Sequence, residues 1–286
     1  MSGNPKDSAN SQNDRPLSTQ HSVLSTQLVR CTPMPRILIT NDDGVYSEGL
    51  RKLAAAVRPL GEVLIVAPDR EQSAASHALT LNRPLRLLQL EENEWIVDGT
   101  PTDCVNLGVL KLMNEHRPDI IVSGINFGPN LGDDVTYSGT ISAAFEGALL
   151  NIPSVAFSTL VGEHYSFDRC AAFAARLVTR LLEDKPNPRI ILNVNFPVGE
   201  FAGVRVTKLG RRIYTEGIIE RRDPRGRSYY WIGGGAPTWH PGQGTDFEAI
   251  ENGFVSITPL HLDLTHHESI PRLKPLEEIL GAPGKK

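Results

Sequence analysis

The amino-acid sequence lacks the features that mark disulfide-rich, membrane-spanning and nucleic-acid-binding proteins. Its 286 residues include only 3 cysteines, an odd and sparse set that argues against a disulfide framework and fits a reducing compartment. No run approaches the roughly 20 apolar residues of a membrane span. The formal net charge is −4, so no basic excess suggests a surface for a nucleic-acid polymer. We therefore expect a cytoplasmic protein that has neither a membrane nor a nucleic-acid polymer as its partner.

Several common catalytic motifs are missing as well. The sequence has no GxSxG nucleophile elbow, no GxxxxGK[ST] phosphate loop, no GxGxxG after a predicted strand and no HExxH motif. The spacing of its Cys and His residues fits no zinc site. What it does have is an ordinary globular balance, with 40% hydrophobic and 22% charged residues, together with 25 Gly and 21 Pro. This composition predicts a globular chain with long, shaped loops.

The first 35 residues differ from the rest of the chain. They are rich in Ser, Asn, Gln and Thr, contain no Phe, Trp or Tyr, and lack the basic-then-apolar layout of a signal peptide. We expect residues 1–35 to form a disordered tail. A cleaved organelle-targeting segment is the alternative, which Arg15 and Arg30 are too few to favour.

Residues 36–198 alternate between short apolar runs and amphipathic stretches. The runs 36–40, 63–67 and 119–123 are typical of buried strands, and a polar loop follows each. The segment 100–103 (TPTD) is a helix start with a capping box. This alternation predicts an α/β catalytic core, a mostly parallel sheet with helices on both faces. Because the three loops follow the carboxyl ends of parallel strands, we expect them to converge.

The pattern changes after Pro197. Residues 199–252 are rich in Gly, Arg and aromatic residues, which predicts extended β structure or a β-hairpin arm. Residues 253–286 then hold a late strand at 254–258 and a C-terminal segment with a short helix near 273–280.

Two loops carry candidate ligands for a cation. Asn41–Gly44 (NDDG) places two adjacent carboxylates at a strand end, where a cation would relieve their repulsion and the cost of removing them from water. Ser73 lies in the small-residue loop 69–80, together with His77. Taken alone, each has a plainer interpretation, because NDDG also forms solvated turns and a lone loop histidine is more often solvated than catalytic.

Two further segments suit a phosphate. The loop 123–134 (SGINFGPNLGDD) is spaced by glycines, its Asn126 can offer a neutral oxygen to a hard cation, and its backbone amides could surround an anion. The segment 137–140 (YSGT) opens a helix, whose amides and dipole favour an anion. Simple helix capping by Ser138 is the alternative. Because the candidate ligands are all oxygens, they favour Mg²⁺, Mn²⁺ or Ca²⁺ over zinc or copper. The four segments together predict phosphate chemistry at a metal site.

These segments are similar to the motifs of a known family. The sequence closely resembles the SurE family of survival-protein 5′-nucleotidases over residues 36–265. The shared motifs are ILITNDDGVYSEGL (37–50), APDREQSAASHALTL (67–81), VDGTPTDCV (97–105), DIIVSGINFGPNLGDDVTYSGTISAAFEG (119–147) and GFVSITPLHLDLT (253–265). The resemblance implies a Rossmann-like core and the hydrolysis of nucleoside 5′-monophosphates, with 3′-monophosphates and short polyphosphate as further candidate substrates.

The resemblance also implies a ligand set and an assembly. The family's metal ligands fall at Asp42, Asp43, Ser73 and Asn126 of this chain, which implies one divalent cation per subunit, Mg²⁺ or Mn²⁺, with Ca²⁺ a possible occupant in a crystal. The family forms dimers, and often tetramers, through β arms and exchanged C-terminal segments. That implies a homodimer or homotetramer, with residues 199–252 and the C-terminal segment in the interface.

The expected phosphate and substrate contacts come from the same loops. They are Asn41, Gly44, Ser123, Gly124, Asn130, Ser138, Gly139 and Thr140. We further hypothesise that Asp42 is the general base or the group that orients the attacking water, with Asp43 mainly a ligand.

The loop around Ser73 departs from the family pattern. Glu71 and Gln72 replace a polar–Arg pair, and Ala74 replaces a glycine, so a positive charge near the site is lost. These changes bear on substrate preference and affinity more than on the class of reaction. They also keep two alternatives open: a protein that binds metal and nucleotide without turnover, and a metal hydrolase that cleaves polyphosphate or another ester.

Overall fold

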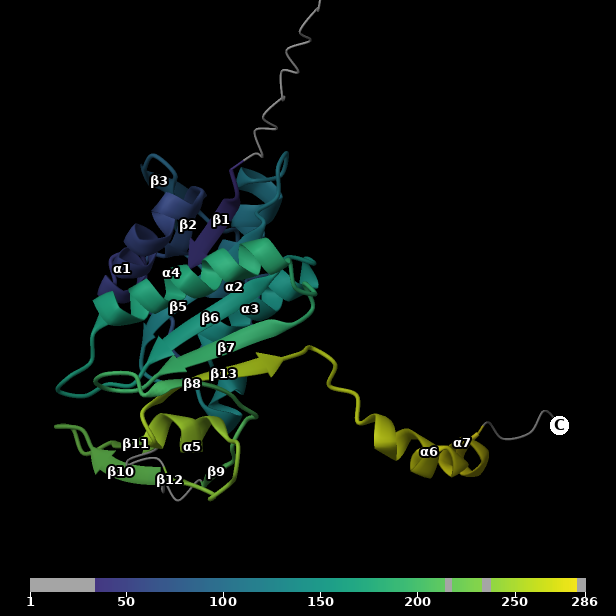
Figure 1. The fold of residues 1–286 in the computed structure, drawn as a ribbon. Helices are drawn as coiled ribbons and strands as arrows, with labels where there is room; N and C mark the ends of the chain where they lie inside the picture. Colours follow the sequence, from purple (N-terminus) through teal and green to yellow (C-terminus); the bar gives the residue numbers. More distant parts are fainter. Residues whose placement is uncertain (1–33, 214–217, 233–237, 282–286) are drawn as a thin grey trace, which may run out of the picture. The chain divides into compact units, whose positions relative to one another are not determined.

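The computed structural model describes residues 34–213, 218–232 and 238–281. Its centre is a nine-stranded sheet with the strand order β3-β4-β2-β1-β5-β6-β7-β13-β8 (Figure 1). These strands are β1 (Arg36–Thr40), β2 (Glu62–Pro68), β3 (Leu87–Glu91), β4 (Glu94–Val97), β5 (Ile120–Phe127), β6 (Ser154–Thr159), β7 (Ile191–Phe196), β8 (Gly203–Val206) and β13 (Phe254–Leu260). The tail expected over residues 1–35 lies outside the described residues, except for Met34 and Pro35.

The sheet is mostly parallel, as predicted. Strands β4, β2, β1, β5, β6 and β7 pair with their neighbours in parallel, whereas β3 is antiparallel to β4 and β13 is antiparallel to β7. The α-helices are α1 (Glu48–Val57), α2 (Pro101–Leu107), α3 (Gly139–Leu149), α4 (Phe167–Asp184), α5 (Asp246–Glu251), α6 (Ile270–Leu273) and α7 (Pro275–Leu280). None of the helices in the described residues is both long and apolar enough to cross a membrane.

Helices cover both faces of the sheet because the strands are apolar on both sides (Figure 1). Successive side chains of a strand point to opposite faces. Ile37 and Ile39 of β1 therefore pack in one buried cluster, with α1 and α4, while Leu38 packs in a second cluster with α2 and α3. The predicted α/β Rossmann-like architecture is confirmed. The capping box of α2 is also present, with Asp103 N donating to the Thr100 hydroxyl at 3.1 Å.

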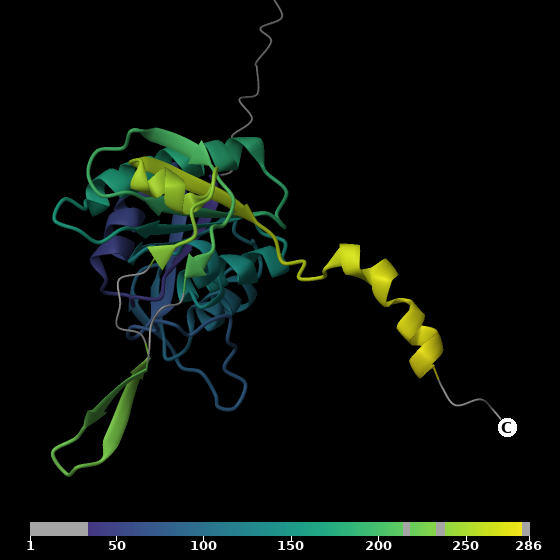
Figure 2. The ribbon, with the colours of Figure 1, turned by 90° about the horizontal axis from the view of Figure 1, so that it is seen from below.

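The stretch 199–252 contains several small elements. Strand β8 lies at the edge of the central sheet, parallel to β13. Strands β10 (Ile218–Arg222) and β11 (Ser228–Ile232) form an antiparallel hairpin (Figure 2), and β9 (Arg212–Ile213) pairs with β12 (Thr238–Trp239). No residue of α6 or α7 is buried. A hairpin is thus present where an arm was expected, and its role in oligomerisation stays a prediction.

Helix α1 packs closely against β5 through a glycine. A Cβ atom added at Gly49 would lie 2.0 Å from the carbonyl oxygen of Ile125 and 3.0 Å from the Phe167 ring. Backbone cannot move away as a flexible side chain can, so this position requires glycine. The contact fixes the distance between α1 and the strand that ends at the polar loop 123–134.

We predict that Gly49→Ala destabilises the protein. Helix propensity alone favours alanine by up to about 1 kcal/mol, but overpacking against the Ile125 carbonyl is expected to cost about 1–3 kcal/mol. The free energy of unfolding, measured in urea, should therefore fall. Ala55→Gly, at an exposed position of the same helix, measures the propensity effect alone. An unchanged or higher urea midpoint for Gly49→Ala would contradict the close contact.

Candidate active site

The predicted polar loops meet at one edge of the sheet. Strand β1 lies between β2 and β5, where the order of the strands along the chain reverses, and ligands of such sheets bind at this point. Gln72 N donates to the Asp42 carbonyl at 2.7 Å, which joins the loop after β2 to the loop after β1. Ser76 N donates to the Tyr137 carbonyl at 3.1 Å, which joins the same loop to the start of α3. The expected convergence of the loops is therefore observed.

Asp42 is the most buried of the candidate ligands, with 5% of the residue exposed. The Thr140 hydroxyl donates to its Oδ1. A Cβ atom at Gly139 would lie 2.8 Å from Asp42 Cβ, so glycine lets the start of α3 approach the carboxylate. Burial raises the pKa of Asp42 from 3.8 to about 6; the Thr140 hydrogen bond opposes this shift and the charge of Asp43 adds to it. A carboxylate of this pKa can accept a proton near neutral pH.

Asp43 is only partly buried. The Phe127 amide donates to its Oδ2 at 3.2 Å, so the loop after β1 also contacts the end of β5. Burial raises the pKa of Asp43 above its usual range, the Phe127 hydrogen bond opposes the shift, and the charge of Glu71 adds to it. Two adjacent carboxylates are thus held where ionisation is costly, and a bound cation would reduce that cost for both.

Asn126 and Ser73 lie around this pair. Asn126 comes just before Phe127, after an irregularity in the pairing of β5 with β6, and its Nδ2 donates to the Gly128 carbonyl at 2.7 Å. A bulge of this kind redirects the side chains that follow it. Ser73 is exposed, and its hydroxyl donates to Glu71. The contacts thus join Asp43 to the Asn126 segment directly, and Ser73 lies in the loop that Gln72 N attaches to the Asp42 carbonyl.

Three of the predicted phosphate contacts, Asn41, Ser138 and Gly124, have structural roles in the turn, the helix cap and the strand packing. Asn41 is fully buried and its Nδ2 donates to the Gly44 carbonyl at 3.0 Å and to the Ser47 hydroxyl at 2.7 Å, which shapes the turn. Ser138 caps α3 by accepting from Ile141 N at 3.1 Å, the plainer role considered for it. At Gly124, φ is +122°, and an added Cβ would lie 2.3 Å from the Phe157 carbonyl oxygen.

Two of the predicted phosphate contacts, Asn41 and Ser123, also have a buried side-chain oxygen without a partner among the described residues. Within the part of the chain that the structure describes, Asn41 Oδ1 and Ser123 Oγ are buried without a hydrogen-bond partner. A buried polar atom without a partner is costly. Asn41 is next to Asp42 in the loop after β1, and Ser123 of β5 pairs with Thr40, the last residue of β1. Both oxygen atoms are available to a ligand, its metal or a water.

Two buried asparagines were missed by the sequence reasoning. Asn195 Oδ1 accepts from Asn130 N at 2.8 Å, and the side-chain amides of Asn193 and Asn195 donate to the Asn130 carbonyl at 2.8 and 3.0 Å. Asn130 Nδ2 donates to Ser158 at 2.8 Å. These bonds fix Asn130. The signal was an Asn-x-Asn pair in the apolar strand ILNVNF, at its carboxyl end.

His77 is exposed, as the loop sequence favoured, but it also has a partner in α3. Its Nε2 lies 2.8 Å from Oε2 of Glu146, a buried residue of α3. Asn106 donates to the other carboxylate oxygen of Glu146 at 2.9 Å. The loop that carries Ser73 is therefore attached to α3 both at Ser76 and at His77.

The residues at this edge fit a hard divalent cation. The donors are carboxylate, hydroxyl and amide oxygens, which Mg²⁺, Mn²⁺ and Ca²⁺ prefer. The raised pKa values of Asp42 and Asp43 and the two buried oxygens without partners are the observations that fit a bound ion. Within the described ranges, at this edge and elsewhere, no group of three or more His, Cys, Asp or Glu side chains could hold a metal, and the set proposed here has only two carboxylates beside a hydroxyl and an amide.

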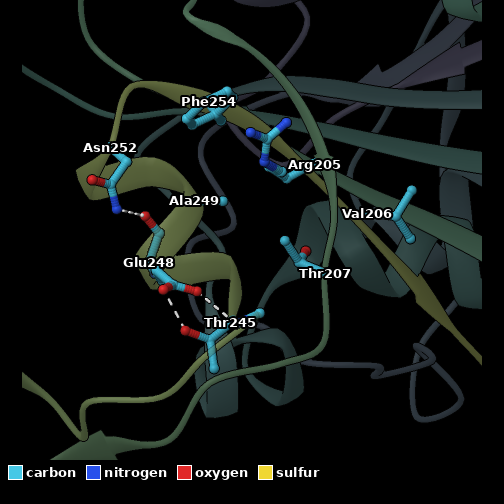
Figure 3. Close-up of a pocket in the computed structure, with 9 residues that line it drawn as sticks. Arg205, Val206, Thr207, Thr245, Glu248, Ala249, Asn252 and Phe254 are labelled. Atoms are coloured by element: carbon cyan, nitrogen blue, oxygen red, sulfur yellow. Dashed lines mark hydrogen bonds between the residues drawn. The ribbon is translucent and has the colours of Figure 1, made fainter.

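A separate hollow lies at the far edge of the sheet (Figure 3). It has a volume of about 240 Å³ and lies between β8 and α5. The Arg205 guanidinium stacks on the Phe254 ring at 3.9 Å, and Gly244 N donates to Glu248 at 2.5 Å. None of the candidate site residues lines this hollow, so it is distinct from the carboxylate pair.

Known proteins that are similar to this chain belong to the family whose motifs the site carries. A family model described as "Survival protein SurE" matches residues 37–216. The chain belongs to the SurE family. A SurE relative from Geobacter metallireducens, named 5′-nucleotidase SurE, is 51% identical over 245 residues, which cover 84% of this chain and 96% of the relative. A relative of the same name from Aquifex aeolicus is 43% identical over 249 residues, covering 86% of this chain and 99% of that protein.

The fold of this SurE family member also has a solved counterpart. A crystal structure of the SurE protein from Aquifex aeolicus matches with a TM-score of 0.77 and 43% identity, over 85% of this chain and 100% of that chain. The resemblance drawn from the motifs is thereby confirmed at the level of family and fold.

We predict that Asp42→Asn stabilises the metal-free protein at high pH. The pKa of Asp42 is about 6 in the folded chain and 3.8 when unperturbed. The folded state therefore holds a proton that the unfolded state has lost, so the contribution of Asp42 to stability falls as pH rises through 6. The full loss is about 3 kcal/mol.

The check is urea unfolding in EDTA at pH 5 and pH 7.5. Because pH 5 lies between the two pKa values, Asp42→Asn should gain roughly half of the full amount at pH 5 and nearly all of it at pH 7.5. Glu115→Gln, which removes an exposed carboxylate outside the site, should show no such dependence. An identical difference at both pH values would contradict the burial of an ionised Asp42.

Proposed function

We propose that the chain is a divalent-metal-dependent 5′-nucleotidase that hydrolyses nucleoside 5′-monophosphates to nucleoside and phosphate. Its family membership supports a phosphoric monoester hydrolase, since curated relatives at about half identity bear the name 5′-nucleotidase SurE. The observation that carries the proposal is the pair of adjacent carboxylates, Asp42 and Asp43, whose pKa values are raised beside the start of α3.

Four residues would hold the cation: Asp42, Asp43, Ser73 and Asn126. When bound, it would neutralise phosphate charge and favour a nucleophilic water near neutral pH. Asp42 would orient that water and accept its proton. Thr140 positions Asp42 by its hydrogen bond. The phosphorus–oxygen bond to the nucleoside breaks as the water oxygen bonds to phosphorus, and the departing nucleoside oxygen takes a proton from solvent to become a hydroxyl.

The start of α3 would stabilise the phosphoryl oxygens. Helix α3 is an 11-residue helix that begins at Gly139, so its first amides and the helix dipole favour an anion there. Gly139 and Thr140 are already positioned next to Asp42. We propose that the amides of residues 138–140, together with Ser123, Gly124 and Asn130, surround the phosphate.

We propose the same organisation that the sequence indicated. Residues 36–198 form the catalytic core, and residues 199–252 with the C-terminal segment 253–286 join subunits in a homodimer or homotetramer. The exposed Tyr230 and Trp231 of the hairpin support an interface there. The buried, free Cys104 and Cys170 support a reducing, cytoplasmic location.

The central test is phosphate release from 5′-AMP with and without EDTA. Chelation should abolish turnover, and Mg²⁺ or Mn²⁺ should restore it. Asp42→Asn should lower kcat about 100- to 10 000-fold, because it removes a proton acceptor and a ligand charge. Asp168→Asn, at an exposed carboxylate on α4, is the matched control.

Undiminished turnover in EDTA, or in Asp42→Asn, would refute the mechanism. Phosphate bound covalently to Asp42 or Asp43 would replace the attacking water with direct carboxylate attack.

A second candidate function follows from Glu71. Its carboxylate raises the pKa of Asp43 and adds negative charge where the family usually has a polar–Arg pair, so a dianionic phosphate is bound less strongly. Nucleotide binding without phosphate release would favour a binding protein. A panel of 5′-AMP, 3′-AMP and tripolyphosphate at one metal concentration would separate the enzymatic alternatives.

We predict that Glu71→Gln lowers the KM for 5′-AMP by about threefold at low salt, because one repulsive charge near the phosphate is removed. Glutamine retains an acceptor for the Ser73 hydroxyl, so the loop contact can persist. The effect should shrink as ionic strength rises. Glu115→Gln is the control at an exposed carboxylate outside the site. A KM that does not change at low salt would show that Glu71 does not act on the substrate.

A further inference from the structure

Two aromatic side chains remain half-exposed next to the carboxylate pair. Phe127 is 48% exposed and Tyr165 is 38% exposed, and their ring centroids lie 5.3 Å apart in an edge-to-face arrangement. The buried Phe167 supports both rings, at 6.2 Å from Phe127 and 5.5 Å from Tyr165. We call Phe127 and Tyr165 the aromatic shelf.

The shelf belongs to the same edge of the sheet as the site. Phe127 ends β5, and its backbone amide donates to Asp43 Oδ2 at 3.2 Å, so the residue that carries this ring contacts the carboxylate pair directly. Tyr165 lies in the loop that follows β6, the parallel neighbour of β5. Loops after neighbouring parallel strands share an edge. The shelf is therefore close enough to contact the rest of a substrate whose phosphate is at the metal site.

We infer that the aromatic shelf binds the nucleobase of the substrate by stacking. This inference rests on the proposed function, because it extends the same site from the phosphate to the base. An exposed ring face next to a polar site has a natural partner in a flat, aromatic base, and such stacking tolerates every base. A ribose separates the base from the phosphate and would span the short distance between shelf and carboxylates. The chain should thus prefer phosphates that carry a base over sugar phosphates, with little choice among bases.

The local structure holds the shelf in place. Gly128, next to Phe127, has φ of +139° and donates its amide to the Thr159 carbonyl at 3.1 Å, which fixes the direction of the chain after the ring. Tyr165 precedes Ser166, the cap of α4, whose hydroxyl accepts from Arg169 N at 3.3 Å. Rings fixed before the ligand arrives lose little freedom on binding, which favours stacking.

The test compares 5′-AMP with ribose 5-phosphate, which has the same phosphate and sugar but no base. In Phe127→Leu and Tyr165→Leu, the KM for 5′-AMP divided by that for ribose 5-phosphate should rise about 5- to 20-fold. Phe127→Tyr keeps a ring and should retain the native ratio. Val161→Ala, which removes an exposed apolar side chain from the loop of Tyr165, is the matched control. A native ratio in both leucine variants would overturn the inference.

A binding measurement separates this inference from the proposed function. Adenosine has a base but no phosphate, so saturation-transfer NMR on the native chain can detect its base contacts without turnover. Transfer to the adenine protons that is lost in Phe127→Leu supports the shelf, even if 5′-AMP is not hydrolysed and the proposed function fails. No transfer in the native chain overturns the shelf while leaving phosphatase activity intact. A changed oligomeric state of Phe127→Leu in size-exclusion chromatography would identify the surface as a contact between copies and would overturn it as well.

Discussion

The structure is organised around the burial of the Asp42 carboxylate beside that of Asp43. An ionised carboxylate is stable only in water or next to compensating groups, and burial here raises the pKa of Asp42 to about 6. The protein supplies one side-chain donor, the Thr140 hydroxyl, and a glycine at 139 that lets this donor approach. A bound cation, as proposed, would offset the remaining cost.

The order of the strands explains why the cost of burying ionised carboxylates falls at one place in the fold. Because β1 lies between β2 and β5, the loops that follow three neighbouring strands meet where Asp42 leaves the sheet. Each loop is then held by a bond to another: Gln72 to the Asp42 carbonyl, Phe127 to Asp43, and Ser76 to Tyr137. The site is therefore assembled from several loops that the order of the strands brings together.

This arrangement also shows what the sequence could predict. Strand β1 has the predicted bounds, because three consecutive apolar residues between Arg36 and Thr40, followed by NDDG, leave few alternatives, and the convergence of the loops followed from parallel strands. The partners of buried polar groups could not be predicted. Asn195 contacts Asn130 across 65 residues, and His77 contacts Glu146 across 69, so strand register and helix packing select these pairs. The expected role of Ser73 as a ligand came only from family resemblance, since a hydroxyl ligand leaves no distinctive pattern, whereas Asn126 was a candidate from its glycine-spaced loop alone.

The loop around Ser73 shows how one chain can vary a shared site. Ala74 has φ of +57°, a left-handed conformation that costs a residue other than glycine roughly 1 kcal/mol, and it stands where the family usually has glycine. The bonds of Gln72, Ser76 and His77 to their neighbours are what maintain that conformation. With Glu71 adding negative charge beside Asp43, the proposed enzyme attracts the phosphate less than a site with arginine would. Binding energy would then have to come from another part of the substrate, and the base over Phe127 and Tyr165 is the part that carries no charge. The preference for 5′-AMP over ribose 5-phosphate, which would come from stacking, would then not depend on salt. The attraction of the site for the phosphate would weaken as salt rises.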